Sequence, residues 1–251
     1  MQKYLLAGAG ILNPELLIRI CIRRREEMSM RKMVIALLLV VLVFGMATMA
    51  IAQTKEPRFP GLKPEQMTDA QKRVFDSISG GPRGAVRSSL GPDGAVRGPW
   101  GPLLRSPELT DRVQKLGEYL RFKTSLPARL SEFAIIINAR FWDSKYEWSS
   151  HKPLAIKGGL AESIASDLAQ NKRPANMKPD EELVYDFCTT LHREHFVPDP
   201  LFKRAVAMFG AAGVVDLVGV TGYYTLISMV LNVAEIPLPP RREIAVVMET
   251  K

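Results

Sequence analysis

The sequence predicts an all-α protein with a single helical domain over residues 64–240. Two observations lead to this prediction. Apolar residues recur at helical spacing in a series of segments that Gly and Pro separate. Outside the first 52 residues, no segment alternates apolar and polar residues as a half-buried strand does. The segments between residues 64 and 240 account for about eight helices.

The N-terminal region has a different composition and reads as a targeting segment. Residues 30–52 contain the three parts of a secretory signal peptide, in the order basic, apolar and small: Arg31-Lys32, Val34 to Phe44, and Ala50-Ile51-Ala52. We therefore expect cleavage near Ala52-Gln53 and an exported protein, periplasmic or secreted. The alternative is a retained membrane anchor, because the uncleaved apolar stretch approaches the ~20 residues of a membrane span.

Residues 1–29 do not fit a signal peptide. Met28, Met30 and Met33 follow closely, so we interpret residues 1–29 as an upstream extension that is not part of the native protein, and Met30 as the natural start.

The charge balance argues against a nucleic-acid partner. The chain carries 34 Lys and Arg and 26 Asp and Glu, a formal charge of +8. Residues 1–52 hold seven of the basic and three of the acidic side chains, which leaves 27 and 23, or +4, in the rest. That rest has no basic cluster with interleaved aromatic residues, the pattern expected of a nucleic-acid surface.

A linker and a long loop lead into the domain. Residues 53–63 are polar and Pro-rich, and a helix is predicted over residues 64–79, ending at Gly80-Gly81. Residues 80–102 hold seven Gly and four Pro without a helical or strand period. So long a loop is usually functional or disordered. Two interpretations remain possible for the part that contains Arg83 and Arg87. It is either a loop that covers a substrate or a solvated connector.

Residues 127–160 are predicted to form the centre of the domain, as two helices joined by a turn near Asp143-Ser144. Pro127 can begin the first helix, in which Glu132 precedes a run that is apolar on every side. The second helix extends from about Tyr146 to Lys157. An antiparallel hairpin would bring Glu132 and His151 to similar heights, and Glu147 shares a helix face with His151. A catalytic pair and a structural hydrogen bond are both consistent with this spacing.

Further helices are predicted over residues 161–170 and 180–195, from Pro200 onward, and over residues 214–234, before a tail at residues 241–251. The segment 214–234 is long and apolar enough to resemble a transmembrane span, but Asp216, Asn232 and two Gly favour a buried packing helix. Cys188 is predicted to be a small buried core residue. His192 and His195 lack a recognised metal motif, so no metal site is expected.

The string YEWSSHKPLAIKGGL at residues 146–160, with Glu132 upstream, resembles the carboxymuconolactone decarboxylase family and its alkylhydroperoxidase-like relatives. The resemblance extends over residues 97–240 and includes a Gly-Tyr-Tyr element at Gly222-Tyr223-Tyr224. Redox members of this family carry a Cys-x-x-Cys, three further residues and a His. If the motif is aligned on His151, Ser144 and Glu147 take the places of the two cysteines. The residues for thiol chemistry are therefore absent. The resemblance implies the family's helical fold and a homo-oligomer, trimer or hexamer.

The resemblance implies a lyase that needs no cofactor and acts on a small carboxylated lactone or a similar acid. The substrate itself can delocalise the negative charge left by decarboxylation. His151 would deliver a proton, Glu132 would orient the imidazole, and the role of Glu147 is less defined. A carboxylate of the substrate would be held by one of the basic or aromatic residues Arg140, Arg97 and Trp100.

Two other functional classes stay open at this point. One is a non-catalytic exported binding or scaffold protein with the same fold. The other is a peroxide-reducing thiol enzyme, which the missing Cys-x-x-Cys argues against because a thiolate is the nucleophile in such enzymes.

Overall fold

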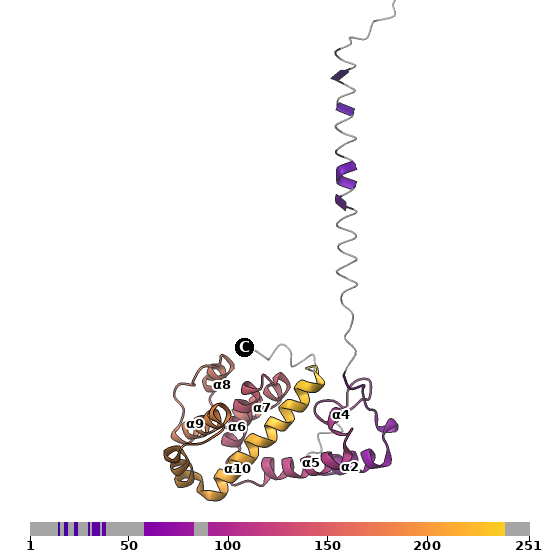
Figure 1. Ribbon diagram of the computed structural model, residues 1–251. Coiled ribbons are helices and arrows are strands. Elements are labelled where there is room, and N and C mark those ends of the chain that lie inside the picture. The colour runs from indigo at the N-terminus through magenta and orange to yellow at the C-terminus, as the bar shows by residue number, and fades with distance from the viewer. Residues whose placement is uncertain are drawn as a thin grey trace, which may run out of the picture. The chain divides into compact units, whose positions relative to one another are not determined.

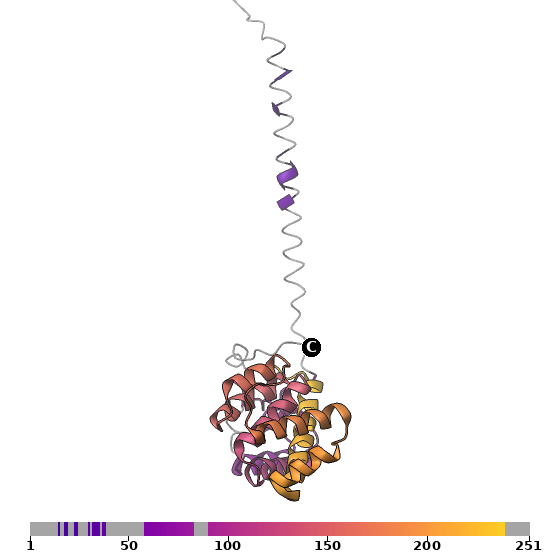
Figure 2. The same ribbon diagram turned by 90° about the vertical axis from the view of Figure 1, so that its left-hand side faces the viewer.

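The computed structural model describes residues 58–82 and 90–238, together with single helical positions between residues 15 and 38 (Figures 1 and 2). The chain divides into two compact units, Met1–Lys55 and Glu56–Lys251. Within residues 58–82 and 90–238 every regular element is a helix, and an isolated bridge joins Leu90 to Val96. The all-α prediction is therefore confirmed for this part. The predicted cleavage site, the loop arginines Arg83 and Arg87, and the tail 241–251 lie outside the described residues.

The helical unit begins with a short 3-10 turn and continues through helices of four to 36 residues. In chain order these elements are η1 (Pro64–Gln66), α2 (Asp69–Gly80), α4 (Trp100–Leu103), α5 (Pro107–Phe122), α6 (Ala128–Phe141), α7 (Lys145–Lys157), α8 (Glu162–Ala169), α9 (Pro179–Glu194) and α10 (Asp199–Ala234).

The start of the unit differs from the prediction of one helix over residues 64–79. Pro64 begins only the 3-10 turn, and α2 starts at Asp69. The reason is a capping box at Thr68. The Thr68 hydroxyl accepts a hydrogen bond from the Gln71 backbone N–H at 3.3 Å, and the Gln71 side chain accepts one from the Thr68 N–H at 2.9 Å.

Helix α6 occupies the centre of the unit and packs against α7, α9 and α10. Its residues from Phe133 to Arg140 are all buried, as the run without a polar face predicts. Figure 1 shows α8 and α9 on the opposite side of α10 from α2 and α4. The core formed around α6 draws on residues from every α-helix named above.

Helix α10 combines the two helices predicted from Pro200 and over residues 214–234. A break at Gly210 separates its two parts, where φ is 70° and ψ is 170°. A residue with a Cβ is strained in this backbone conformation, so glycine suits the position. Within the described residues, α10 is the one helix with the length and apolar character of a membrane span. Its buried Asp216, Tyr223 and Tyr224 fit a packing helix instead.

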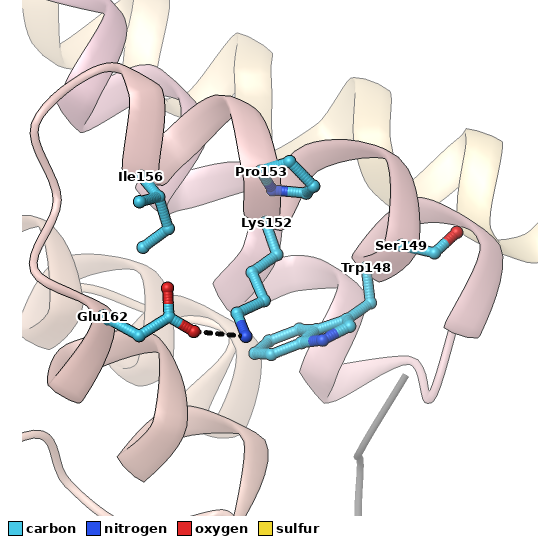
Figure 3. A pocket seen from close by; sticks show the side chains of 6 residues that line it. All are labelled: Trp148, Ser149, Lys152, Pro153, Ile156 and Glu162. Atoms are coloured by element: carbon cyan, nitrogen blue, oxygen red, sulfur yellow. Dashed lines mark ion pairs between the residues drawn. The ribbon is translucent and has the colours of Figure 1, made fainter. Parts of the chain in front are cut away.

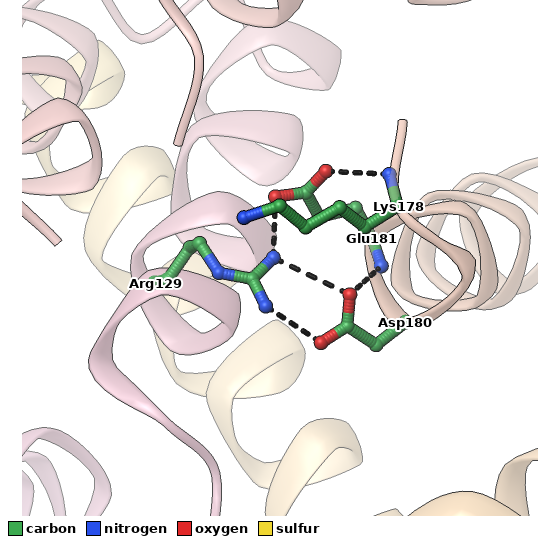
Figure 4. A network of polar contacts seen from close by, with 4 residues as sticks. All are labelled: Arg129, Lys178, Asp180 and Glu181. Carbon is green, nitrogen blue, oxygen red and sulfur yellow. Dashed lines mark hydrogen bonds and ion pairs between the residues drawn. The ribbon is translucent and has the colours of Figure 1, made fainter. Parts of the chain in front are cut away.

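A polar network joins the first turns of α6 and α9 (Figure 4). Arg129 donates from Nη2 to Asp180 Oδ2 at 2.6 Å and forms a second ion pair with Glu181. Glu181 is 1% exposed and also accepts from the Lys178 backbone N–H at 2.7 Å. Because each of the two acids has a charged partner, the network can be buried without an isolated charge.

Candidate active site

The α6–α7 hairpin brings the predicted catalytic residues together. The chain reverses at Asp143, which has a φ of 47°, and Ser144 N–H donates to the Ala139 carbonyl at 2.8 Å. At the far end, Gly158 lies against the start of α6, where a Cβ would come within 3.2 Å of the Arg129 backbone. The two helices are therefore antiparallel and closely packed, as predicted from the turn position.

His151 lies between two carboxylates at the middle of this hairpin. Its Nδ1 is 2.6 Å from Glu132 Oε2, and its Nε2 is 3.3 Å from Glu147 Oε2. The side chains of His151, Glu132 and Glu147 are 8%, 14% and 5% exposed. The shorter contact fixes the ring through Nδ1, whereas the contact of Nε2 with Glu147 Oε2 is at ion-pair distance and is not a hydrogen bond.

Tyr224 of α10 completes the inner wall of the site. Its ring meets the His151 ring edge to face, with 5.0 Å between the centroids. Burial raises the pKa of the Tyr224 phenol well above its usual range; nearby Arg121 lowers it in part, and the charges of Glu147 and Glu132 raise it further. Tyr224 is therefore a neutral hydroxyl that can donate a hydrogen bond beside His151.

Arg121, near the end of α5, is the cation on the outer side of the site. Its Nη2 lies 3.9 Å from Glu132 Oε1. Its Nε atom is buried and has no hydrogen-bond partner among the described residues. A guanidinium with an unused donor beside a partly exposed carboxylate is suited to binding an anionic ligand.

The three residues predicted to bind a substrate carboxylate contact residues other than His151, Glu132 and Glu147. Arg140 is 3% exposed and pairs with Asp143 at the end of α6. Arg97 pairs with Asp93 within its own loop at 2.8 Å. Trp100 is part of the hydrophobic core at the start of α4. Their proposed contact with substrate remains a prediction, whereas Arg121 lies directly beside Glu132.

Sequence reasoning missed Tyr224 and Arg121 as site residues. The Gly-Tyr-Tyr element places Tyr224 in the packing helix predicted over residues 214–234, and nothing in the sequence around it indicates that its ring reaches His151. Arg121 sits near the end of an amphipathic helix, a place where a basic residue is common because it complements the helix dipole. Only the packing of α5 and α10 against the hairpin connects the two residues to it.

The metal-binding side chains and the thiol can be located among the described residues. The described residues contain no group of three or more His, Cys, Asp or Glu side chains that could hold a metal. Cys188 is buried, as predicted, and burial raises the pKa of its thiol to about 12. Such a thiol is almost never a thiolate at neutral pH, so Cys188 is unsuited to nucleophilic chemistry.

A cavity of about 320 Å³ opens on another face of α7 (Figure 3). Trp148, Ile156 and Pro153 form its apolar wall, and Lys152 and Glu162 pair across it at 2.6 Å. His151 and Glu132 do not line this cavity. Tyr224 instead lies against the His151 ring, and Arg121 lies beside Glu132.

No protein-family model and no curated protein match the sequence. Solved structures do match the fold. The alkylhydroperoxidase AhpD core of an uncharacterized peroxidase-related protein from Ralstonia eutropha JMP134 is 15% identical, with a TM-score of 0.57 over 74% of this chain and 94% of its own. An uncharacterized peroxidase-related protein from Silicibacter sp. TM1040 is also 15% identical, with a TM-score of 0.57 over 76% and 96%. The chain therefore has the all-α alkylhydroperoxidase-like fold.

Proposed function

We propose that the protein is a cofactor-free acid–base enzyme, a carboxy-lyase acting on a small carboxylated lactone or a related acid. The observation that carries the proposal is the buried arrangement of His151 between Glu132 and Glu147, with the Tyr224 ring against it. A proton donor, an orienting carboxylate and a neutral hydroxyl together supply what decarboxylation of an unsaturated acid requires. The resemblance of the residue 146–160 string to carboxymuconolactone decarboxylases supports the substrate class.

In the proposed reaction, the bond between the substrate and its carboxylate breaks and carbon dioxide leaves. The electron pair enters the unsaturated lactone as a dienolate. Tyr224 O–H would donate a hydrogen bond to the developing oxyanion, and His151, as an imidazolium, would transfer its Nε2 proton to the carbon that lost the carboxylate and then regain a proton from solvent. Glu132 would hold Nδ1 throughout, so the longer contact to Glu147 is the one that a substrate replaces. Arg121 would pair with a carboxylate of the substrate.

A second copy of the chain would complete the solvent side of this site. The exposed faces of α5 and α10 adjoin, because Tyr119 O–H donates to Asp216 at 3.0 Å. Large apolar side chains are exposed along both helices: Leu116, Tyr119, Phe122, Val215, Val218, Met229 and Val233. Apolar residues that follow two helices mark a surface for protein association. The Phe122 ring also lies beside the Arg121 guanidinium, 5.1 Å from centroid to Cζ.

The oligomer is tested by analytical ultracentrifugation. We expect a trimer or hexamer that dissociates when Val215 and Val218 are both replaced by Lys. Phe196→Lys changes an equally exposed apolar residue outside these faces and should leave the assembly unchanged. A monomeric native chain would contradict the proposal.

Export is proposed from the N-terminal composition alone. Expression with the complete N-terminus followed by intact mass analysis of the recovered protein tests it. A mature chain that starts at Gln53 supports export, and a chain that keeps the apolar segment supports the membrane anchor.

The closed packing around His151 also suits a non-catalytic binding or scaffold protein, since both ring nitrogens already face carboxylates. Release of carbon dioxide from small carboxylated lactones and β-keto acids distinguishes the two functions. Turnover that disappears in His151→Ala and persists in His195→Ala supports the enzyme. Absence of turnover and of ligand binding, with both variants folded, supports the scaffold.

A further inference from the structure

A second cavity lies between α6, α8 and α9, apart from the residues of the candidate active site. Its volume is about 190 Å³. Ile137, Phe141 and Leu168 give it an apolar wall, and Lys172, His192 and Arg193 give it a basic side. A concave space with an apolar wall and a few polar groups has the form of a small-molecule site.

The charges around this cavity are not balanced. None of the residues that line it is Asp or Glu. Among the described residues, neither Lys172 nor Arg193 forms an ion pair, and the Lys172 ammonium donates to the neutral Gln170 side chain at 2.5 Å. The C-terminal ends of α8 and α9 lie beside Lys172 and Arg193 and partly offset their charge. The lining of the cavity therefore carries two cationic side chains and no carboxylate.

His192 supplies an unused polar group at the same place. Its ring stacks on Phe141, with 4.4 Å between centroids and 12° between planes. Its Nε2 atom is buried and has no hydrogen-bond partner among the described residues. Burial lowers the pKa of His192 to about 4, so the imidazole is neutral at pH 7. A ligand that bonds to this nitrogen would satisfy a buried polar atom that otherwise lacks a partner.

We propose that this cavity binds a small carboxylate with an apolar body. Lys172 and Arg193 attract the carboxylate, the Nε2–H tautomer of His192 donates a hydrogen bond to one of its oxygens, and the side chains of Ile137, Phe141 and Leu168 contact the hydrocarbon part. The apolar wall favours an organic acid over inorganic phosphate. This proposal does not depend on the proposed decarboxylase activity, because the cavity shares no residue with that site.

The test is calorimetric titration of the full-length chain with butyrate, benzoate and inorganic phosphate at constant ionic strength. We expect butyrate or benzoate to bind, and the double variant Lys172→Gln/Arg193→Gln to weaken binding at least tenfold, since a lost charge-assisted hydrogen bond corresponds to about a tenfold change. His192→Phe keeps the stacked ring and should weaken binding as well. Arg173→Gln is the control, because it removes a nearby cation that does not line the cavity.

Proton NMR locates the ligand independently. The chain has three histidines, so the ring signals can be assigned by substitution. A bound carboxylate should shift the His192 signals and raise the pH at which His192 titrates, with the His195 signals unchanged. The proposal is overturned by the absence of binding, by binding that the double variant retains, by a preference for phosphate, or by binding that Arg121→Gln abolishes, which would place the ligand beside Glu132.

Discussion

The Nδ1 atom of His151 lies 2.6 Å from Oε2 of Glu132, although 19 residues separate them in the chain. The contact joins facing positions of α6 and α7, and the side chains of His151 and Glu132 are 8% and 14% exposed. Such a short contact fixes the imidazole plane and leaves Nε2 directed at Glu147. Glu132 therefore decides which nitrogen of His151 can exchange a proton with a ligand.

Glu132→Gln should lower kcat on any accepted substrate by about 10²–10⁴-fold, because the amide keeps the shape but not the charge that supports an imidazolium. The control is Glu162→Gln, which removes an exposed carboxylate paired with Lys152 on another face of α7. Steady-state kinetics measures both. Equal activity in the two variants would reduce Glu132 to a structural residue.

Tyr224→Phe should lower kcat by about 10²-fold, with circular dichroism and stability close to those of the native chain, because the ring still packs against His151. Since burial raises the pKa of Tyr224, its proton remains bound beyond pH 10. The native pH–rate profile should therefore show no alkaline decline from this group below pH 10. Tyr223→Phe, one residue away, is the control. If Tyr223→Phe lowered kcat as much as Tyr224→Phe does, the effect would come from packing and not from the Tyr224 hydroxyl.

Arg121→Gln should raise KM for a carboxylated substrate by about tenfold or more, because it removes the guanidinium with the unused buried Nε donor. Arg112→Gln provides the comparison on the same helix, since Arg112 is exposed and pairs with Glu108. For an uncharged ester of the substrate, Arg121→Gln and the native chain should have the same KM. If the two values differ, Arg121 acts on the site's structure rather than on the ligand's charge.

Arg129→Met should lower the free energy of unfolding by about 3–5 kcal/mol, because it leaves the buried Glu181 without its cation. Arg173→Met removes a half-exposed cation paired with Asp186 and Glu182. The cost there should be no more than about 1 kcal/mol. Urea denaturation followed by circular dichroism compares the two. Similar costs would mean that the α6–α9 network is no more important than a surface pair.

The same network should contribute to stability in a pH-dependent way. Burial alone would raise the pKa of Asp180, but hydrogen bonds and charge from Arg129 outweigh it and hold that pKa below 3.8. A carboxylate with a lowered folded pKa stabilises the protein above its unfolded pKa, and this stabilisation is lost as the pH falls through the folded value. The stability difference between the native chain and Arg129→Met should therefore shrink below about pH 4. A constant difference down to pH 2 would contradict this assignment.

The hairpin was predictable because its signals are local. Local residues determine where α6 and α7 begin and end: Pro127, the apolar run after Glu132, and Gly158-Gly159. Given these boundaries, helix geometry brings Glu132 next to His151. Arg121 and Tyr224 were not predictable, because their place depends on how α5 and α10 pack. Trp100 lies in the hydrophobic core at the start of α4, and its contact with a substrate remains a prediction. The break at Gly210 falls between the two helices predicted from Pro200 and over residues 214–234.

The burial of Cys188 makes this thiol a natural reporter of conformational opening. It is fully buried within α9, and its Sγ lies 3.6 Å from the Thr221 hydroxyl of α10. An alkylating reagent can reach it only when these two helices separate. In a Cys21→Ser background, the rate of alkylation at saturating reagent would equal the rate at which α9 leaves α10, and its denaturant dependence would distinguish local separation from complete unfolding.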